Sequence, residues 1–178
     1  ALAPHRFDTR SGLALLLGYL GRADEAVRIL REAPEPHGHF VAEFLLSTAR
    51  NLARDRYLPE ALVLAEAALA ESPRNTDARV EVAVRNAALG RKVPAEQQFR
   101  EALRRDPAHR QARDEFAAFL ALNQRWDEAL TVLLGAGRDP ATRLKQAQLL
   151  MARRDWAGAD QVLRELEAAG DLAEDVAA

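Results

Sequence analysis

Apolar residues recur along most of this chain at intervals of three and four positions. Near the start, Leu13, Leu16, Leu17 and Leu20 show the pattern. Because an α-helix turns once in about 3.6 residues, this spacing places the apolar side chains on one face of a helix. No segment shows the alternation of apolar and polar residues that is typical of a half-buried strand. The pattern predicts an all-α protein.

The helical pattern repeats at a nearly constant interval. Pro73 and Pro107, each of which follows an alanine-rich segment, lie 34 residues apart. Proline ends a helix because it lacks an N–H group and clashes with the preceding turn. Alanines near the start of each predicted second helix mark the same period, at Ala26, Ala61, Ala95, Ala129 and Ala159. A small side chain lets two helices cross closely, so we predict that Ala95 and Ala129 lie at such crossings.

The most regular copy is residues 78–107, "ARVEVAVRNAALGRKVPAEQQFREALRRDP". A period of 34 residues with two helices resembles the tetratricopeptide repeat (TPR), whose signature includes A-x3-F and a terminal proline. Ala95 and Phe99 match A-x3-F, Gly90 matches the turn between the helices and Pro107 matches the terminator. Arg79 stands where the family usually has tryptophan. The resemblance implies an all-α, right-handed superhelical solenoid of about five antiparallel helix pairs.

The resemblance covers nearly the whole chain, which we interpret as a single TPR-like domain, 1–178. The repeats are expected near 7–41, 42–75, 76–109, 110–139 and 140–170, with a tail at 171–178. Trp126 and Trp156 are expected at the starts of second helices, where this family often has an aromatic residue.

Two places depart from the regular repeat. Gly135 and Gly137 fall where the fourth unit's second helix should continue, so we expect that helix to be short. Only a short segment follows the last predicted helix, although a solenoid needs a polar terminal surface. We therefore expect Val162 and Leu166 to lie partly uncovered.

Composition narrows the classes of partner. The chain has 178 residues, 48% of them hydrophobic, and a formal net charge of −2. Without a field of one sign, nucleic acid and anionic membrane surfaces are disfavoured as partners. No apolar run approaches the roughly 18 residues of a membrane span. A soluble protein is expected, either cytoplasmic or exported after signal cleavage, since the sequence starts without Met.

Candidate chemistry is sparse in this sequence. There is no cysteine, which excludes disulfides and thiolate ligands. His37 and His39 could offer two imidazoles to a metal, but a closed site needs three or four ligands and no third lies nearby. No phosphate-binding loop, zinc-protease motif or nucleophile motif occurs. The sequence predicts a protein that is not an enzyme and has no metal or cofactor.

Proteins of this family bind peptides or helices of other proteins in a concave groove lined by the first helices. Carried over position by position, the resemblance implies a groove lined by Arg50, Arg54, Asp77, Val80, Glu81, Val84, Gln111, Asp114, Glu115, Ala118, Lys145 and Gln148. Some members of the family hold the C-termini of chaperones with lysines and asparagines on this face. This sequence lacks them, and Glu81 and Glu115 stand at two of the matching positions. The charge order predicts a basic beginning and an acidic centre, with the acidic residues facing solvent.

The sequence thus favours a non-catalytic scaffold that binds a protein or peptide ligand in this groove. One alternative is a self-association module of a larger assembly, with a homodimer as the simplest form. Another is a regulatory or substrate-presenting domain of a longer enzyme.

Overall fold

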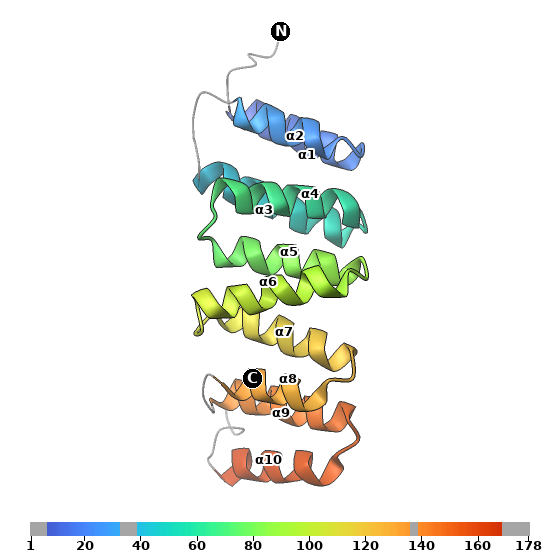
Figure 1. Ribbon diagram of the computed structural model, residues 1–178, viewed down its shortest axis with the longest axis vertical. Coiled ribbons are helices and arrows are strands. Elements are labelled where there is room, and N and C mark those ends of the chain that lie inside the picture. The colour runs from blue at the N-terminus through green and yellow to red at the C-terminus, as the bar shows by residue number, and fades with distance from the viewer. Residues whose placement is uncertain (1–6, 33–38, 136–138, 169–178) are drawn as a thin grey trace. The chain divides into compact units, whose positions relative to one another are not determined.

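The computed structural model describes residues 7–32, 39–135 and 139–168, and in these residues it contains ten α-helices and no strand (Figure 1). The helices are α1 (Phe7–Tyr19), α2 (Ala23–Arg31), α3 (His39–Arg54), α4 (Leu58–Glu71), α5 (Thr76–Ala88), α6 (Lys92–Arg105), α7 (Arg110–Leu122), α8 (Trp126–Leu134), α9 (Pro140–Ala152) and α10 (Trp156–Ala168). The predicted all-α fold class and the division into helix pairs are confirmed.

The same tight turn joins the two helices of every pair. A backbone N–H at the start of the second helix donates to a carbonyl five residues earlier, from Arg22 to Leu17, Tyr57 to Leu52, Arg91 to Asn86, Arg125 to Leu120 and Asp155 to Leu150, at 2.8 or 2.9 Å. The residue before each donor has a positive φ, between 62 and 74°. This is the Schellman motif, which satisfies the last carbonyl groups of a helix. Its recurrence confirms the predicted repeat period in the backbone itself.

The repeat alanines occupy one equivalent position in the second helices. The N–H groups of Ala61, Ala95 and Ala129 each donate to a carbonyl four residues earlier, at 3.0–3.1 Å, which places these alanines in the first turn. All three side chains are fully buried. This burial agrees with the prediction that Ala95 and Ala129 lie at close helix crossings, and the crossings themselves stay a prediction.

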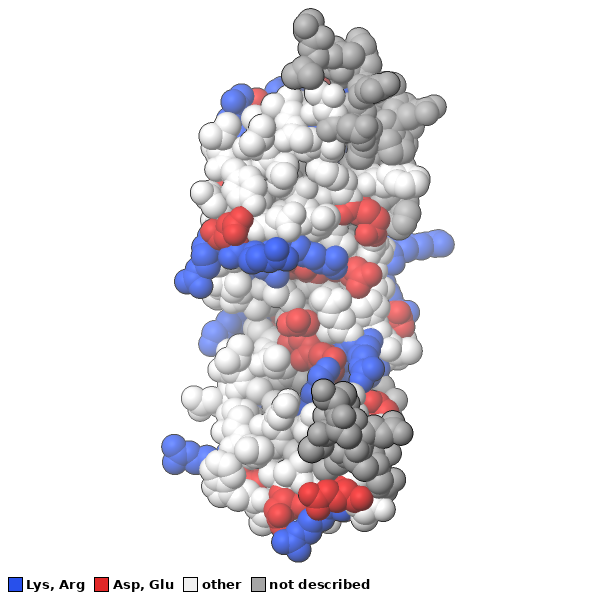
Figure 2. Space-filling view, turned by 180° about the vertical axis from the view of Figure 1, so that it is seen from behind, with Lys and Arg blue, Asp and Glu red and all other residues white. Residues whose placement is uncertain are grey.

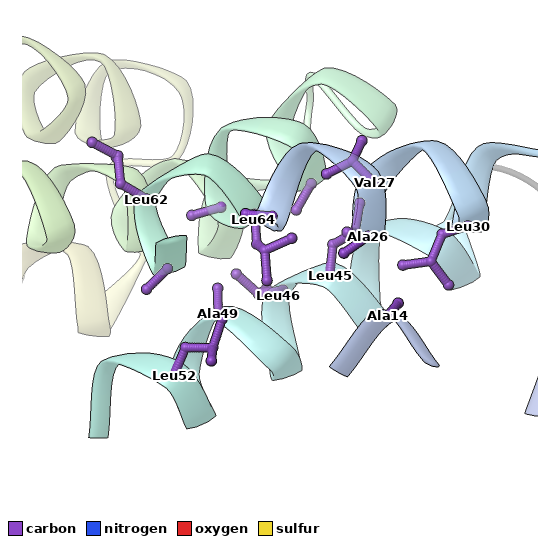
Figure 3. Close-up of a cluster of buried hydrophobic side chains, with 14 of the residues drawn as sticks. Ala14, Ala26, Val27, Leu30, Leu45, Leu46, Ala49, Leu52, Leu62 and Leu64 are labelled. Atoms are coloured by element: carbon purple, nitrogen blue, oxygen red, sulfur yellow. The ribbon is translucent and has the colours of Figure 1, made fainter. Parts of the chain in front are cut away.

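The chain divides into two compact units, residues 1–112 and 113–178, which are described separately. In the first unit, α1 packs on α2, α3 on α4 and α5 on α6, and α4 also packs on α5. Figure 3 shows leucines of successive helices meeting in the core, among them Leu30 of α2, Leu45 and Leu52 of α3 and Leu64 of α4, each at most 1% exposed. Each pair therefore completes its core against the next one.

In the second unit, the core lies mainly between α9 and α10, where Ala147 and Leu150 pack against Ala159, Val162 and Leu166. Val162 is 6% exposed and Leu166 is 1% exposed, so the expectation that they lie partly uncovered is wrong. The reason is that α10 turns these side chains toward α9.

Helix lengths and boundaries follow most of the expectations. The fourth pair has the expected short second helix, since α8 has 9 residues and α6 has 14. Trp126 and Trp156 begin α8 and α10 as predicted. The second repeat begins earlier than expected, because α3 starts at His39. Gly137, His37 and the predicted tail 171–178 lie outside the described residues. That the two units form one domain stays a prediction.

Arginines near the starts of first helices connect the two helices of a pair. Nη1 of Arg10 donates to the carbonyl of Ile29 at 3.1 Å, and Nη1 of Arg79 donates to the side-chain oxygen of Gln98 at 2.9 Å. Burial, and secondarily the nearby Arg105, lower the pKa of Arg79. Each of these two arginines therefore links the first helix of its pair to the second.

Candidate protein-binding surface

Helix α3, the first helix of the second pair, presents a polar face. On α3, Glu43, Ser47, Arg50 and Arg54 are exposed at helical spacing. The opposite side of α3 contributes fully buried residues such as Leu45 to the core. Arg50 and Arg54 therefore lie on the surface, where a ligand can reach them.

The structure corrects the expectation for Glu81. This residue of α5 is only 3% exposed, whereas the sequence predicted a solvent-facing carboxylate. One oxygen, Oε2, accepts a hydrogen bond from Nε of Arg50 at 3.3 Å. The other, Oε1, lies 2.9 Å from Nε of Arg85 in an ion pair without hydrogen-bond geometry. The two guanidinium groups neutralise the buried charge of Glu81, so this carboxylate does not make the surface acidic as expected.

The structure also corrects the expectation that Val80 lines the groove. It is fully buried, so it belongs to the core and cannot line a groove. Helix α5 packs against α3, α4 and α6, and this encirclement leaves a narrow exposed strip. Within that strip, Asp77 is exposed and Val84 is half-buried.

Asp77 lies beside His109 at the end of the first unit. Its Oδ1 lies 3.3 Å from Nε2 of His109, and Nδ1 of the same imidazole accepts a hydrogen bond from the N–H of Ala112 at 3.2 Å. His109 thus caps the first turn of α7. Gln111, one residue before Ala112, is exposed.

In the second unit, four of the predicted residues surround a hollow of about 270 Å³. It is bounded by α7, α8 and α9 and lined by Asp114, Ala117, Ala118, Leu133, Lys145, Gln148 and Leu149. Most of this lining is apolar. The size and character of the hollow suit one large apolar side chain.

The polar groups of the hollow come from α7 and α9. Lys145 Nζ of α9 forms an ion pair with Asp114 of α7, and both side chains are partly exposed. Gln148 and Ala118 are exposed beside them. Glu115 is half-buried on α7 and is outside this lining. Figure 2 shows basic and acidic side chains next to one another on one face of the protein.

Sequence reasoning missed several of the residues that make these surfaces. Arg85 lies four residues after Glu81, which is the spacing of an ion pair within one helix. From this spacing the sequence could have predicted that the charge of Glu81 is neutralised. The sequence predicted groove residues only on the exposed faces of first helices. This prediction therefore omitted Leu133, which belongs to the second helix α8, and Leu149, which is half-buried on α9.

Two structural findings bear on other classes of function. In the part of the chain that the structure describes, no three histidine, aspartate or glutamate side chains lie close enough together to hold a metal ion. No described helix combines the length and the apolar character that crossing a membrane requires.

Known structures share this arrangement over nearly its full length. A thermophilic TPR protein from Thermus thermophilus is 22% identical to this chain, with 96% of this chain and 94% of that chain covered and a TM-score of 0.65. The chain has the tetratricopeptide-repeat fold.

Other solved structures with high similarity agree. PilW, a type IV pilus biogenesis factor, is 18% identical over 94% of this chain and 78% of its own, with a TM-score of 0.64. MamA protein is 12% identical over 95% and 97%, with a TM-score of 0.65. No family model and no curated protein matches the sequence. At these identities the likeness establishes the fold.

Proposed function

We propose that this protein is a non-catalytic binding module that takes up a segment of another protein on the exposed faces of its first helices. The observation that carries the proposal is the apolar hollow between α7, α8 and α9. A hollow with mostly apolar walls and a few polar groups is the usual form of a site that takes up an apolar group of a ligand.

The groups around the hollow define the kind of ligand. An apolar side chain of the ligand would enter it and displace water from the exposed Ala118 and the half-buried Leu149. The exposed amide of Gln148 both donates and accepts hydrogen bonds, so it can pair with the ligand's peptide groups. Asp114 and Lys145 would orient charged neighbours of the apolar residue. The ligand is therefore a peptide or helix with one large apolar side chain between polar residues.

A selection from a phage-displayed library of random peptides tests this proposal. The selected peptides should share an aromatic or large aliphatic residue, and isothermal titration calorimetry would give their affinity. The variant Ala118→Phe places a phenyl ring at the mouth of the hollow without entering the core, since Ala118 is exposed. Blocking the hollow should weaken binding at least tenfold, which corresponds to about 1.4 kcal/mol.

A matched control is Ala141→Phe, which adds the same ring at an exposed position of α9 outside the lining. It should bind the selected peptides like the unmodified protein. If Ala118→Phe retains full affinity and an unchanged circular dichroism spectrum, the ligand does not use this hollow and the proposed site is wrong.

A further inference from the structure

The outer face of α1 is unusually apolar for an exposed helix face. Leu13, Leu16 and Leu20 are 46, 62 and 69% exposed and follow one another at intervals of three and four residues. They therefore form one stripe along the helix. We refer to these three side chains as the α1 stripe.

The later repeats show that one position of this face, that of Leu13, is covered in the other pairs of the first unit. The turns and buried alanines align α1 with α3 at an offset of 35 residues and with α5 at an offset of 69. Leu13 then corresponds to Thr48 and Val82, which are only 3 and 4% exposed. In α3 and α5 that position is covered by packing among neighbouring pairs of the first unit. In α1 the corresponding side chain is apolar and uncovered.

The last helix has the opposite character. On α10, Asp160 and Arg164 form an ion pair at 2.8 Å, with 59 and 76% of their side chains exposed. Ala61 of α4 corresponds to Ala159, so Asp160 takes the place of Leu62, which is 4% exposed. The face of α10 that carries this pair is thus polar. If this face of α10 from another copy packed on the α1 stripe, the ion pair would lose its contact with water. The leucines of the stripe offer no polar group to replace that water.

A second copy of α1 matches the stripe better. The segment "SGLALLLGYLG", residues 11–21, contains no charged residue, so two copies can meet along it without bringing like charges together. Leu16 lies near the middle of the stripe. A two-fold axis at Leu16 would pack Leu13 of each copy near Leu20 of the other copy. The helix is also held firmly in its own fold. The hydroxyl of Tyr19 donates to Asp55 at 2.6 Å, and its ring packs edge-on against Tyr57.

We propose that the α1 stripe is a homodimer interface, in which α1 of one copy packs antiparallel on α1 of a second copy. The stripe shares no residue with the hollow between α7, α8 and α9, so the dimer goes beyond the proposed peptide binding and does not depend on it. It would present two copies of the binding surface in one assembly.

Sedimentation velocity over a concentration series tests the proposal. The unmodified protein should sediment at twice the monomer mass, and Leu16→Glu should reduce the mass to that of the monomer. A glutamate at the centre would face its own copy across the axis, where two like charges repel. Because Leu16 is largely exposed within one copy, the variant should keep the helical circular dichroism signal. The control Leu122→Glu changes a leucine of α7 that is 86% exposed and should leave the dimer intact.

A cysteine variant gives a second, independent measurement. The chain contains no cysteine, so Leu16→Cys introduces a single thiol. Under mild oxidation it should form a covalent dimer, and Leu122→Cys should form little. A protein that remains monomeric across the series, or a dimer that persists in Leu16→Glu, would overturn the proposal, as would equal cross-linking of both cysteine variants.

Discussion

At the turns between paired helices, three residues other than glycine hold a left-handed backbone conformation. Arg56, Gln124 and Arg154 have φ values of 73, 62 and 67°. Gly21 and Gly90 occupy the equivalent places with φ of 74°. A side chain in this conformation brings Cβ close to the following carbonyl oxygen, which costs roughly 1–2 kcal/mol, and glycine avoids that cost. The three turns therefore hold strain that the two glycine turns lack.

Replacing Arg56 by glycine should stabilise the protein. The strain is relieved, and the greater flexibility of glycine in the unfolded chain offsets part of the gain. We expect the free energy of unfolding to rise by about 0.5–1 kcal/mol, measured by urea denaturation. The reverse change, Gly90→Ala, should lower it by about 1 kcal/mol. A destabilised Arg56→Gly would mean that the arginine side chain contributes more than its exposed position indicates.

At the scale of the helix pair, the small residues set how closely two helices approach. Ala95 and Ala129 are fully buried in the first turns of α6 and α8. A methyl group there lets the first helix of the pair pack directly against the backbone of the second. A close crossing at this position would explain why alanine stands there in all five pairs of the described residues.

Enlarging either alanine to leucine should overpack the crossing. The extra methyl and methylene groups have no room, so Ala95→Leu and Ala129→Leu should each lower the free energy of unfolding by about 1–3 kcal/mol. Thermal and urea denaturation would measure the change. Ala70 is an exposed alanine of α4, and Ala70→Leu should change stability by less than about 0.5 kcal/mol. Wild-type stability in both buried variants would show that the helices do not cross at these residues.

At the scale of the whole molecule, the two units differ in how complete they are. Residues 1–112 hold three helix pairs, and one core cluster extends from α1 to α5. The boundary at residue 112 falls inside α7, so residues 113–178 begin within a helix. A repeat fold needs about three stacked repeats before the buried surface balances the loss of chain entropy. Only the first unit meets this requirement within its own length.

We therefore expect residues 1–112 to fold alone. This fragment should show a helical circular dichroism spectrum and a cooperative thermal transition. The fragment 113–178 should show weak helicity and no cooperative transition, because it contains few complete pairs and a small core. A cooperative transition of 113–178 at the temperature of the intact chain would contradict this expectation.

Much of the fold could be predicted from the sequence because its signals are local. Helical periodicity, the helix-ending prolines and the alanine period depend on neighbours a few residues apart, and they predicted helix pairs in the correct phase. The glycines after α8 likewise predicted its early end. These features need only the geometry of a single helix and its turn.

Which side chains reach the surface was decided by the tertiary structure. Helical spacing marks a face, but whether that face meets solvent depends on how many helices pack around it. Helix α5 is surrounded by three others, so Val80 and Glu81 became buried, and Glu81 acquired Arg50 as a partner 31 residues away. The hollow beside Asp114 and Lys145 forms only where α7, α8 and α9 meet. The sequence by itself determined the helices and their period, and packing between distant helices decided which residues a ligand can touch.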